Sequence, residues 1–311
     1  MNKRLFWAVL STVLTAAAIT VSVLCIRFLK PPSSPVTTLG TTPTTTTTTS
    51  ITTVPTTTAT VAQPFAFTDS QVKELDTLLA NMDGNVSALY MDIQTGYTYR
   101  YNANARYNAA STMKAPYCLY LLEMANEGKC DLTKQITYTS DIISRGTGKI
   151  KNDPYGTQYT VETLIEYAIR YSDNAALRML RNAYPADGFQ QYAKTLGLQN
   201  SGHIGWITNS TLTVDEAAIY MQRIYTFTQN DPINGKKLRE YMLKTTNPMF
   251  VSQYPLLRKY GWATKAFHDM AVAEAPHPYI IVMLTDHEDG NGADFAAFRN
   301  FSKKIENFSN R

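Results

Sequence analysis

The pair of residues best suited to chemistry in this chain of 311 residues is Ser111 and Lys114, which are separated by Thr-Met. Serine is a poor nucleophile until a base removes its proton, and residues three apart on a helix lie on the same face. The apolar residues after Lys114 predict such a helix. The same spacing also occurs at Ser70 and Lys73. The spacing alone therefore does not identify a nucleophile.

The Ser70 copy is explained by helix structure. Apolar residues recur at helical spacing through residues 72–82, behind a Thr68-x-x-Gln71 capping pattern. This pattern predicts an amphipathic helix with Lys73 on its solvated side, so the later pair is the better candidate.

Two further segments could complete a site around Ser111. Residues 172–174 read Ser-Asp-Asn and follow a predicted helix that begins at Thr160. Residues 259–261 read Lys-Tyr-Gly and begin the first of three predicted strands. Each segment alone fits a solvated helix edge or an exposed turn. Their order along the chain, on helix, loop and strand, distinguishes Ser111 from Ser70.

This ordered set resembles the Ser-x-x-Lys, Ser-Asp-Asn and Lys-Thr-Gly motifs of class A β-lactamases and penicillin-binding proteins. The resemblance covers residues 68–308. It implies an active-site-serine hydrolase that is acylated at Ser111 by β-lactams or D-Ala-D-Ala-type amides and that needs no cofactor or metal. The implied site residues are Ser111, Lys114, Ser172 and Asn174 for catalysis, and Lys259, Tyr260, Gly261 and Trp262 for substrate binding.

The residue types suit acyl transfer. Lys114 can accept the Ser111 proton only while it is neutral, and both burial and a second cation, Lys259, lower the pKa of its ammonium group. By the resemblance, Ser172 passes a proton to the leaving amide nitrogen, and Asn174 holds Lys114 and a substrate amide.

The third motif departs from the family at one position. By the resemblance, the backbone N–H of Trp262 joins that of Ser111 in holding the oxyanion, and a cationic Lys259 suits substrates that carry a carboxylate. Tyr260 stands where the family usually has threonine or serine, whose hydroxyl helps to bind that carboxylate. We therefore expect a changed affinity for ordinary β-lactams.

The deacylation residue of class A β-lactamases is missing. These enzymes carry a glutamate on a loop after the Ser-Asp-Asn helix, and it activates the water that frees the acyl-enzyme. Residues 202–214 read GHIGWITNSTLTV and contain no carboxylate, while Glu162 and Glu166 precede the Ser-Asp-Asn segment. His203 is an alternative base, although a lone loop histidine is more often a surface residue. The sequence therefore predicts acylation followed by slow release.

Three functions fit these observations. The first is a β-lactamase-like serine hydrolase that turns over slowly or on an unknown substrate. The second is a cell-wall D,D-peptidase, which does not need that glutamate. The third is a non-catalytic module that binds peptidoglycan or β-lactams on the same fold. The intact catalytic residues argue against the third function, whereas Tyr260 and the missing glutamate favour it.

The predicted elements run helix, two strands, a block of helices, three strands and helix. A single sheet built from both ends of the sequence, with the helical block inserted, explains this order. We predict an α/β (α+β) fold with a mixed, mostly antiparallel sheet. Its sheet part is expected at residues 65–110 and 250–311 and its helical part at residues 111–249, with strands near 85–94, 97–102, 259–262, 268–275 and 279–285 and a last helix near 293–308.

The first 30 residues form a targeting element. Lys3 and Arg4 precede the mostly apolar residues 5–26, a stretch long enough to cross a bilayer of ~30 Å as a helix. The small residues at 16–18 resemble a signal peptidase site, but the apolar run continues beyond them. An uncleaved signal anchor in the cell membrane is therefore favoured over a secreted protein.

Residues 31–64 form a linker that is dominated by threonine with interspersed proline and has no charged residue. Such a stretch cannot bury enough apolar surface to fold. Tracts of this composition are typical of extracellular stalks, sometimes O-glycosylated, although a cytoplasmic disordered linker is an alternative. We expect an extracellular catalytic domain at residues 65–311, active as a monomer.

Charge and cysteine content exclude other classes. A formal charge of +4 with no basic run beyond the N-terminus does not suggest nucleic acid. The three cysteines show no metal-binding spacing. Cys118 follows Ser111 by two helical turns and is expected to be a small buried residue, although a disulfide with Cys130 is an alternative.

Overall fold

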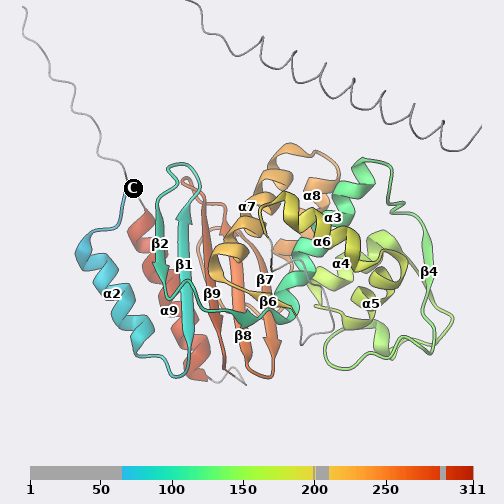
Figure 1. The fold of residues 1–311 in the computed structure, drawn as a ribbon, viewed down its shortest axis with the longest axis horizontal. Coiled ribbons are helices and arrows are strands. Elements are labelled where there is room, and N and C mark those ends of the chain that lie inside the picture. Colours follow the sequence, from blue (N-terminus) through green and yellow to red (C-terminus); the bar gives the residue numbers. More distant parts are fainter. Residues whose placement is uncertain (1–64, 199, 201–209, 288–291, 311) are drawn as a thin grey trace, which may run out of the picture. The chain divides into compact units, whose positions relative to one another are not determined.

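A five-stranded sheet lies at the centre of the fold, and its strands come from both ends of the chain (Figure 1). The structure is a computed structural model that describes residues 65–310 except 199, 201–209 and 288–291. The strand order is β2-β1-β9-β8-β7, and each neighbouring pair is antiparallel. The predicted single sheet is confirmed. Its strands are β1 (Val86–Asp92), β2 (Thr98–Tyr101), β7 (Leu256–Ala263), β8 (Ala266–Ala273) and β9 (Tyr279–Thr285).

The middle of the sheet is covered on both faces. Every residue of β8 and β9 is buried, which matches their nearly continuous apolar sequences. Strand β1 pairs with β9 along its whole length, with Leu89 opposite Val282. This pairing joins the N-terminal hairpin to the C-terminal strands.

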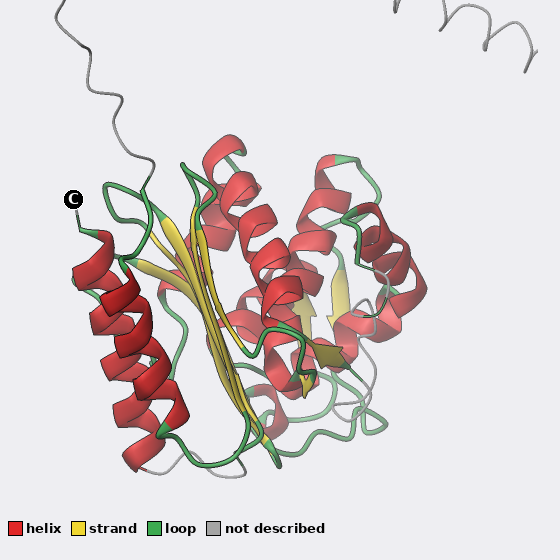
Figure 2. Cartoon of the chain, turned by 60° about the vertical axis from the view of Figure 1, so that its left-hand side comes forward, coloured by secondary structure: helices red, strands yellow, loops and turns green. Residues whose placement is uncertain are grey.

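Two helices, α2 (Asp69–Ala80) and α9 (Gly292–Ser309), cover one face of the sheet (Figure 2). Helix α2 begins with the predicted capping box, in which Thr68 and Gln71 each satisfy a backbone N–H of the other. The apolar cluster beneath these helices is rich in aromatic side chains, and it includes Phe67, Tyr90, Tyr260, Phe267, Phe298 and Phe301.

The helical block lies on the other face (Figure 2). Helix α7 contacts β1, β8 and β9 and so joins the block to the sheet. The block buries a second apolar cluster that is built mainly from its own helices. Its helices are α3 (Lys114–Asn126), α4 (Val161–Arg170), α5 (Asn174–Ala183), α6 (Ala186–Thr195), α7 (Val214–Asn230) and α8 (Asn234–Leu243).

Short elements within the block were not predicted. Two small antiparallel ribbons pair β3 with β6 and β4 with β5, and two 3-10 turns, η1 and η2, accompany them. Elements of two to four residues are too short to produce a hydrophobic period that sequence reading can detect. Their bounds are β3 (Tyr107–Asn108), η1 (Ala110–Met113), β4 (Gln135–Thr137), η2 (Ile150–Asn152), β5 (Gln158–Thr160) and β6 (Thr211–Leu212).

The structure describes two of the cysteines but not the N-terminal segments. Cys118 and Cys130 are both buried free thiols, so the alternative of a disulfide between them is wrong. The proposed anchor and linker, residues 1–64, lie outside the described residues. Among the helices that the structure does describe, none is both long and apolar enough to span a membrane.

Candidate active site

Ser111 lies in the 3-10 turn η1, and the α-helix begins only at Lys114. The turn packs against strand β7 at Gly261. A Cβ atom added to Gly261 would lie 3.0 Å from Thr112 Cγ2 and 3.1 Å from the Ala109 carbonyl oxygen. Such tight contacts favour glycine, so Gly261 lets the turn that carries Ser111 pack closely against the strand.

Strand β7 lies at one edge of the sheet, so one row of its backbone groups has no neighbouring strand. The carbonyl of Arg258 accepts from Thr245 Oγ1, and the carbonyl of Tyr260 accepts from Lys259 Nζ, so both point away from β8. Backbone groups of alternate residues share an edge. The N–H of Trp262 therefore also lies on the free edge, where the oxyanion donor was predicted.

Lys114 reaches from the start of α3 into the Ser-Asp-Asn segment. Its Nζ lies 2.5 Å from the carbonyl oxygen of Ser172, 3.1 Å from Ser172 Oγ and 2.7 Å from Asn174 Oδ1. The predicted contact between Asn174 and Lys114 is present. Lys114 is 2% exposed, so these contacts replace water around the amine.

Lys259 meets the same serine from the strand. Its Nζ lies 3.1 Å from Ser172 Oγ and 2.9 Å from the Tyr260 carbonyl oxygen, and its side chain is fully buried. The hydroxyl of Ser172 therefore lies between two lysine amines. One motif from a helix, one from a loop and one from a strand converge on this oxygen atom.

Burial dominates the electrostatics of both amines. It lowers the pKa of Lys114 to about 7, against the opposing attraction of the Asp173 carboxylate. Burial also lowers the pKa of Lys259 well below its usual range, and the charges of Lys114 and Arg258 act in the same direction, whereas Asp269 opposes them. A base with a pKa near neutrality is what proton transfer from a serine requires.

Backbone strain marks both sides of the site. Ala110, just before the nucleophile, has φ 46°, and Ser172 has φ 50°. Such left-handed conformations cost a non-glycine residue roughly 1–2 kcal/mol. They persist because neighbouring groups hold the chain in place.

Asp173 supplies much of this support. Its Oδ1 caps α5 by accepting from the Ala176 N–H, and its Oδ2 accepts from the N–H groups of Lys149 and Ile150. A Cβ atom at Gly148 would lie 2.4 Å from Asp173 Cγ. The Ser-Asp-Asn segment is therefore docked on residues 145–150, a contact that the sequence analysis did not predict.

Two hydrogen bonds complete this docking. Thr147 Oγ1 donates to the Ser172 carbonyl, and Asn174 Nδ2 donates to the Arg145 carbonyl. The signal that could have identified the loop is its Arg-Gly-Thr-Gly sequence, since Gly146 and Gly148 both have positive φ.

A second residue that sequence reading missed is His268 on β8. Its Nε2 lies 2.6 Å from the Asn108 carbonyl, and the Thr285 N–H donates to its Nδ1. These partners require the neutral form protonated at Nε2. Burial lowers the pKa of His268 to about 4. His268 thus fixes the chain three residues before Ser111.

Tyr260 and Trp262 are placed differently from each other. Tyr260 is 2% exposed and belongs to the aromatic cluster beneath α2 and α9, so little of its side chain is available to a substrate. Trp262 is 40% exposed and packs edge-on against Phe267 and Phe295. The strand carries both predicted residues, but Tyr260 points into the protein.

Neither glutamate near the Ser-Asp-Asn segment is free to act as a base for deacylation in the part of the site that the structure describes. Glu162 pairs with Lys237, and Glu166 pairs with Arg170. His203 lies outside the described residues.

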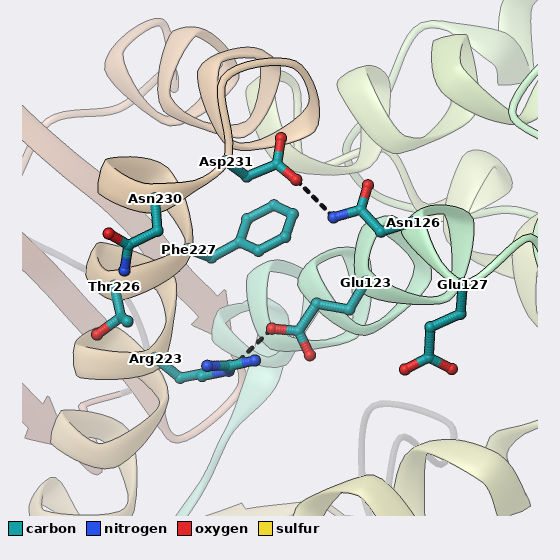
Figure 3. Close-up of a pocket in the computed structure, with 8 residues that line it drawn as sticks. All are labelled: Glu123, Asn126, Glu127, Arg223, Thr226, Phe227, Asn230 and Asp231. Atoms are coloured by element: carbon teal, nitrogen blue, oxygen red, sulfur yellow. Dashed lines mark hydrogen bonds and ion pairs between the residues drawn. The ribbon is translucent and has the colours of Figure 1, made fainter.

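A polar pocket of about 350 Å³ lies between α3 and α7, away from this site. Figure 3 shows the residues that line it. Glu123 faces Arg223 there, and Asn126 donates to Asp231. Glu127, the other acidic group of the pocket, pairs with Lys129. Within the described ranges, no cluster of three or more His, Cys, Asp or Glu side chains could hold a metal ion.

The chain is similar in sequence to known β-lactamases. It is 24% identical to β-lactamase SME-1 of Serratia marcescens over 135 residues, which cover 42% of this chain and 45% of that protein. It is 31% identical to β-lactamase ROB-1 of Haemophilus influenzae over 123 residues, 38% of each chain. These matches span less than half of either relative. A β-lactamase of Mycobacterium tuberculosis is 26% identical over 215 residues, 61% of this chain and 69% of that protein.

Solved structures share the fold. PBP-A superposes with a TM-score of 0.70 at 18% identity, covering 77% of this chain and 95% of that chain. A β-lactamase from Chitinophaga pinensis superposes with a TM-score of 0.71 at 18% identity, covering 78% and 100%.

The fold is therefore the one shared by β-lactamases and penicillin-binding proteins. The chain belongs to the beta-lactamase enzyme family, whose profile matches residues 70–308.

Proposed function

We propose that this protein is an exported serine hydrolase that takes an acyl group from β-lactams or D-Ala-D-Ala-type amides onto Ser111 and releases it slowly. The observation that carries this proposal is the position of Ser172 Oγ, 3.1 Å from both Lys114 Nζ and Lys259 Nζ. Such an arrangement relays protons between a base, a hydroxyl and a leaving group.

The reaction returns Lys114 and Ser172 to their starting protonation states. Ser111 Oγ attacks the carbonyl carbon while neutral Lys114 takes its proton, and the tetrahedral intermediate forms. The C–N bond then breaks as Ser172 donates its proton to the leaving nitrogen and recovers one from Lys114. The product is an ester on Ser111, with Lys114 again neutral. Positioned acid–base groups of this kind accelerate reactions roughly 10²- to 10⁴-fold.

Two backbone N–H groups are suited to the oxyanion. The N–H of Ser111 lies in the first turn of η1, where a helix leaves its donors without partners within the helix. The N–H of Trp262 lies on the free edge of β7. Each such donor contributes about 3–4 kcal/mol to transition-state stabilisation.

Slow release follows from what the sequence lacks. Residues 202–214 contain no carboxylate to activate a water. We expect the acyl-enzyme to persist for minutes or longer.

Intact-mass spectrometry of residues 65–311 with penicillin G tests the proposal. The expected result is a gain of the mass of one penicillin, retained over time. Ser111→Ala should abolish the adduct, whereas Ser70→Ala, at the other Ser-x-x-Lys pair, should leave it unchanged. Labelling that survives in Ser111→Ala would show that the nucleophile is another residue, and rapid return to free protein with opened drug would indicate an efficient β-lactamase.

A D,D-peptidase is the second candidate, and the missing carboxylate favours it. A peptide ending in D-Ala-D-Ala would then be cleaved with release of D-alanine. PBP-A offers a structural parallel, since a point mutant of that protein was solved as an acyl-enzyme complex with penicillin G. Absence of both an adduct and D-alanine release would leave a binding module for peptidoglycan or β-lactams.

The location of the protein is part of the proposal. Residues 5–26 would anchor the chain in the bacterial membrane, and the threonine-rich linker would carry the catalytic domain to the cell wall. We expect a membrane-bound product that retains Lys3 and Arg4. A mature N-terminus near Ile19 would contradict the anchor.

A further inference from the structure

The proposed reaction requires two similar amines to behave differently. Lys114 must be neutral to take a proton, whereas Lys259 must be charged to attract a substrate carboxylate. Both amines are buried, and both lie 3.1 Å from the same hydroxyl oxygen of Ser172. Some group in the site must favour the charge on Lys259.

The partners of Lys114 suit a neutral amine. A neutral amine has two N–H donors and one lone pair. The carbonyl of Ser172, at 2.5 Å, and Oδ1 of Asn174, at 2.7 Å, are the two nearest acceptors and suffice for the two N–H groups of a neutral amine. The third contact, from Lys114 Nζ to Ser172 Oγ, is longer at 3.1 Å, and without it the lone pair is free to take the Ser111 proton.

The partners of Lys259 suit an ammonium group. Ser172 Oγ and the Tyr260 carbonyl are two acceptors. The third partner is the aromatic ring of Tyr260, whose centroid lies 4.0 Å from Lys259 Nζ. The face of an aromatic ring carries negative charge density and attracts a cation, most strongly where both are desolvated.

We propose that the ring of Tyr260 is a positioning residue that keeps Lys259 protonated through a cation–π contact, and so assigns the base role to Lys114. This inference rests on the proposed function. It also explains the departure at Tyr260, because the side chain acts through its buried ring face rather than through a hydroxyl that contacts the substrate.

The surrounding charges do not make this contact redundant. Lys114, on α3, and Arg258, on β7, both disfavour a charge on Lys259, whereas Asp269 on β8 favours it. Cys118 on α3 also faces this group, but burial raises the pKa of its thiol to about 12, so it carries no charge at neutral pH. Asp269 is itself fully buried, and burial raises its pKa.

Two substitutions in the full-length chain separate the ring from the hydroxyl. Acylation by penicillin G should be fastest between the pH at which Lys114 loses its proton and the pH at which Lys259 does. Tyr260→Leu removes the ring, and the alkaline limb should move down by about one pH unit. Tyr260→Phe, the matched control, keeps the ring, and the limb should stay in place.

A fluorinated series protects the test against misfolding. Phenylalanine bearing no, one, two or three fluorine atoms at position 260 keeps its shape while the negative face weakens. The alkaline limb should move down with each fluorine atom. A limb that does not respond to fluorination would overturn the proposal, because packing alone does not depend on the ring quadrupole.

A direct readout separates this proposal from the proposed function. The Lys259 Cε resonance in lysine-labelled protein, assigned by comparison with Lys259→Arg, reports its protonation without any substrate. Its titration midpoint should fall along the fluorinated series even if no β-lactam acylates Ser111. A midpoint that is the same in every variant would refute the role of Tyr260, whatever the activity.

Discussion

Two buried polar clusters hold the chain just before and just after Ser111, at Asn108 and at Lys114, and they differ in character. In the cluster of His268, Asn108 and Thr285, the imidazole donates from Nε2 to the Asn108 carbonyl and accepts at Nδ1 from the Thr285 N–H. In the cluster of Lys114, Ser172 and Lys259, two amines share one hydroxyl, and burial depresses the pKa of both. The first cluster suits a fixed support, and the second suits proton transfer.

The backbone shows the same contrast. Ser172, in the lysine cluster, has positive φ, whereas His268 and Thr285 sit in regular strands. A strained backbone conformation persists only where several neighbouring contacts hold it in place. We therefore expect changes to the lysine cluster to affect activity more than stability, and changes to its supports to affect both.

Lys114→Met gives the largest expected effect. Acylation of Ser111 by penicillin G should slow by about 10²- to 10⁴-fold, because the serine loses its base. The free energy of unfolding at pH 7 should change by less than about 1 kcal/mol, since the lost hydrogen bonds are offset by removing an amine that is costly to bury. Stopped-flow acylation and urea unfolding measure the two quantities.

Lys73→Met is the matched control for this prediction. Lys73 occupies the same place in the other Ser-x-x-Lys pair but is exposed on α2. It should change neither quantity. A large loss of stability in Lys114→Met, with acylation retained, would show that the lysine cluster is structural after all.

Gly148→Ala should affect both properties. The added Cβ would meet the Asp173 carboxyl group at 2.4–2.6 Å, at a backbone φ of +126°. Strain and displaced hydrogen bonds should lower the free energy of unfolding by about 2–3 kcal/mol and slow acylation as Ser172 shifts. Gly156→Ala, at φ +95° with no atom within 4 Å of the added Cβ, should cost only about 1 kcal/mol and leave acylation unchanged. Equal effects in the two variants would indicate backbone strain alone.

Much of the fold follows from local sequence signals. The Thr68 capping box, the two strands predicted near 85–94 and 97–102 and the apolar run of β9 each specify their own element, and each element is found. The ordered motifs also brought Lys114, Ser172 and Lys259 together correctly, because the resemblance supplied the long-range arrangement that spacing alone could not.

The remaining features depend on contacts between distant segments. The support that residues 145–150 give to Asp173 joins loops separated by more than 20 positions, and no local period signals it. The contact between the Lys259 amine and the Tyr260 ring joins neighbouring residues of one strand. The sequence does not predict it, because the side chains of neighbouring strand residues start on opposite faces of the sheet. The role of His268 required knowing that β8 lies beside the chain leading to Ser111.

His268→Gln is the prediction with the smallest expected effect, and it tests the supporting cluster through its pH dependence. The folded protein holds the imidazole neutral, with a pKa of about 4 against an ordinary value of 6.5. Below pH 6.5 the unfolded chain therefore binds a proton that the folded chain does not, and stability falls as the pH drops towards 4. At pH 5 the loss attributable to this residue is about 2 kcal/mol.

Glutamine can donate to the Asn108 carbonyl and accept from the Thr285 N–H, but it does not titrate. Urea unfolding at pH 7.5 and pH 5 should therefore show a smaller acid loss in His268→Gln than in the unmodified protein. Acylation by the folded protein at pH 5 should be the same in both, because a His268 with a pKa of about 4 is still neutral there and keeps its bond to the Asn108 carbonyl. An identical acid loss in the two proteins would mean that His268 is not held neutral, and the contrast between the two clusters would then fail.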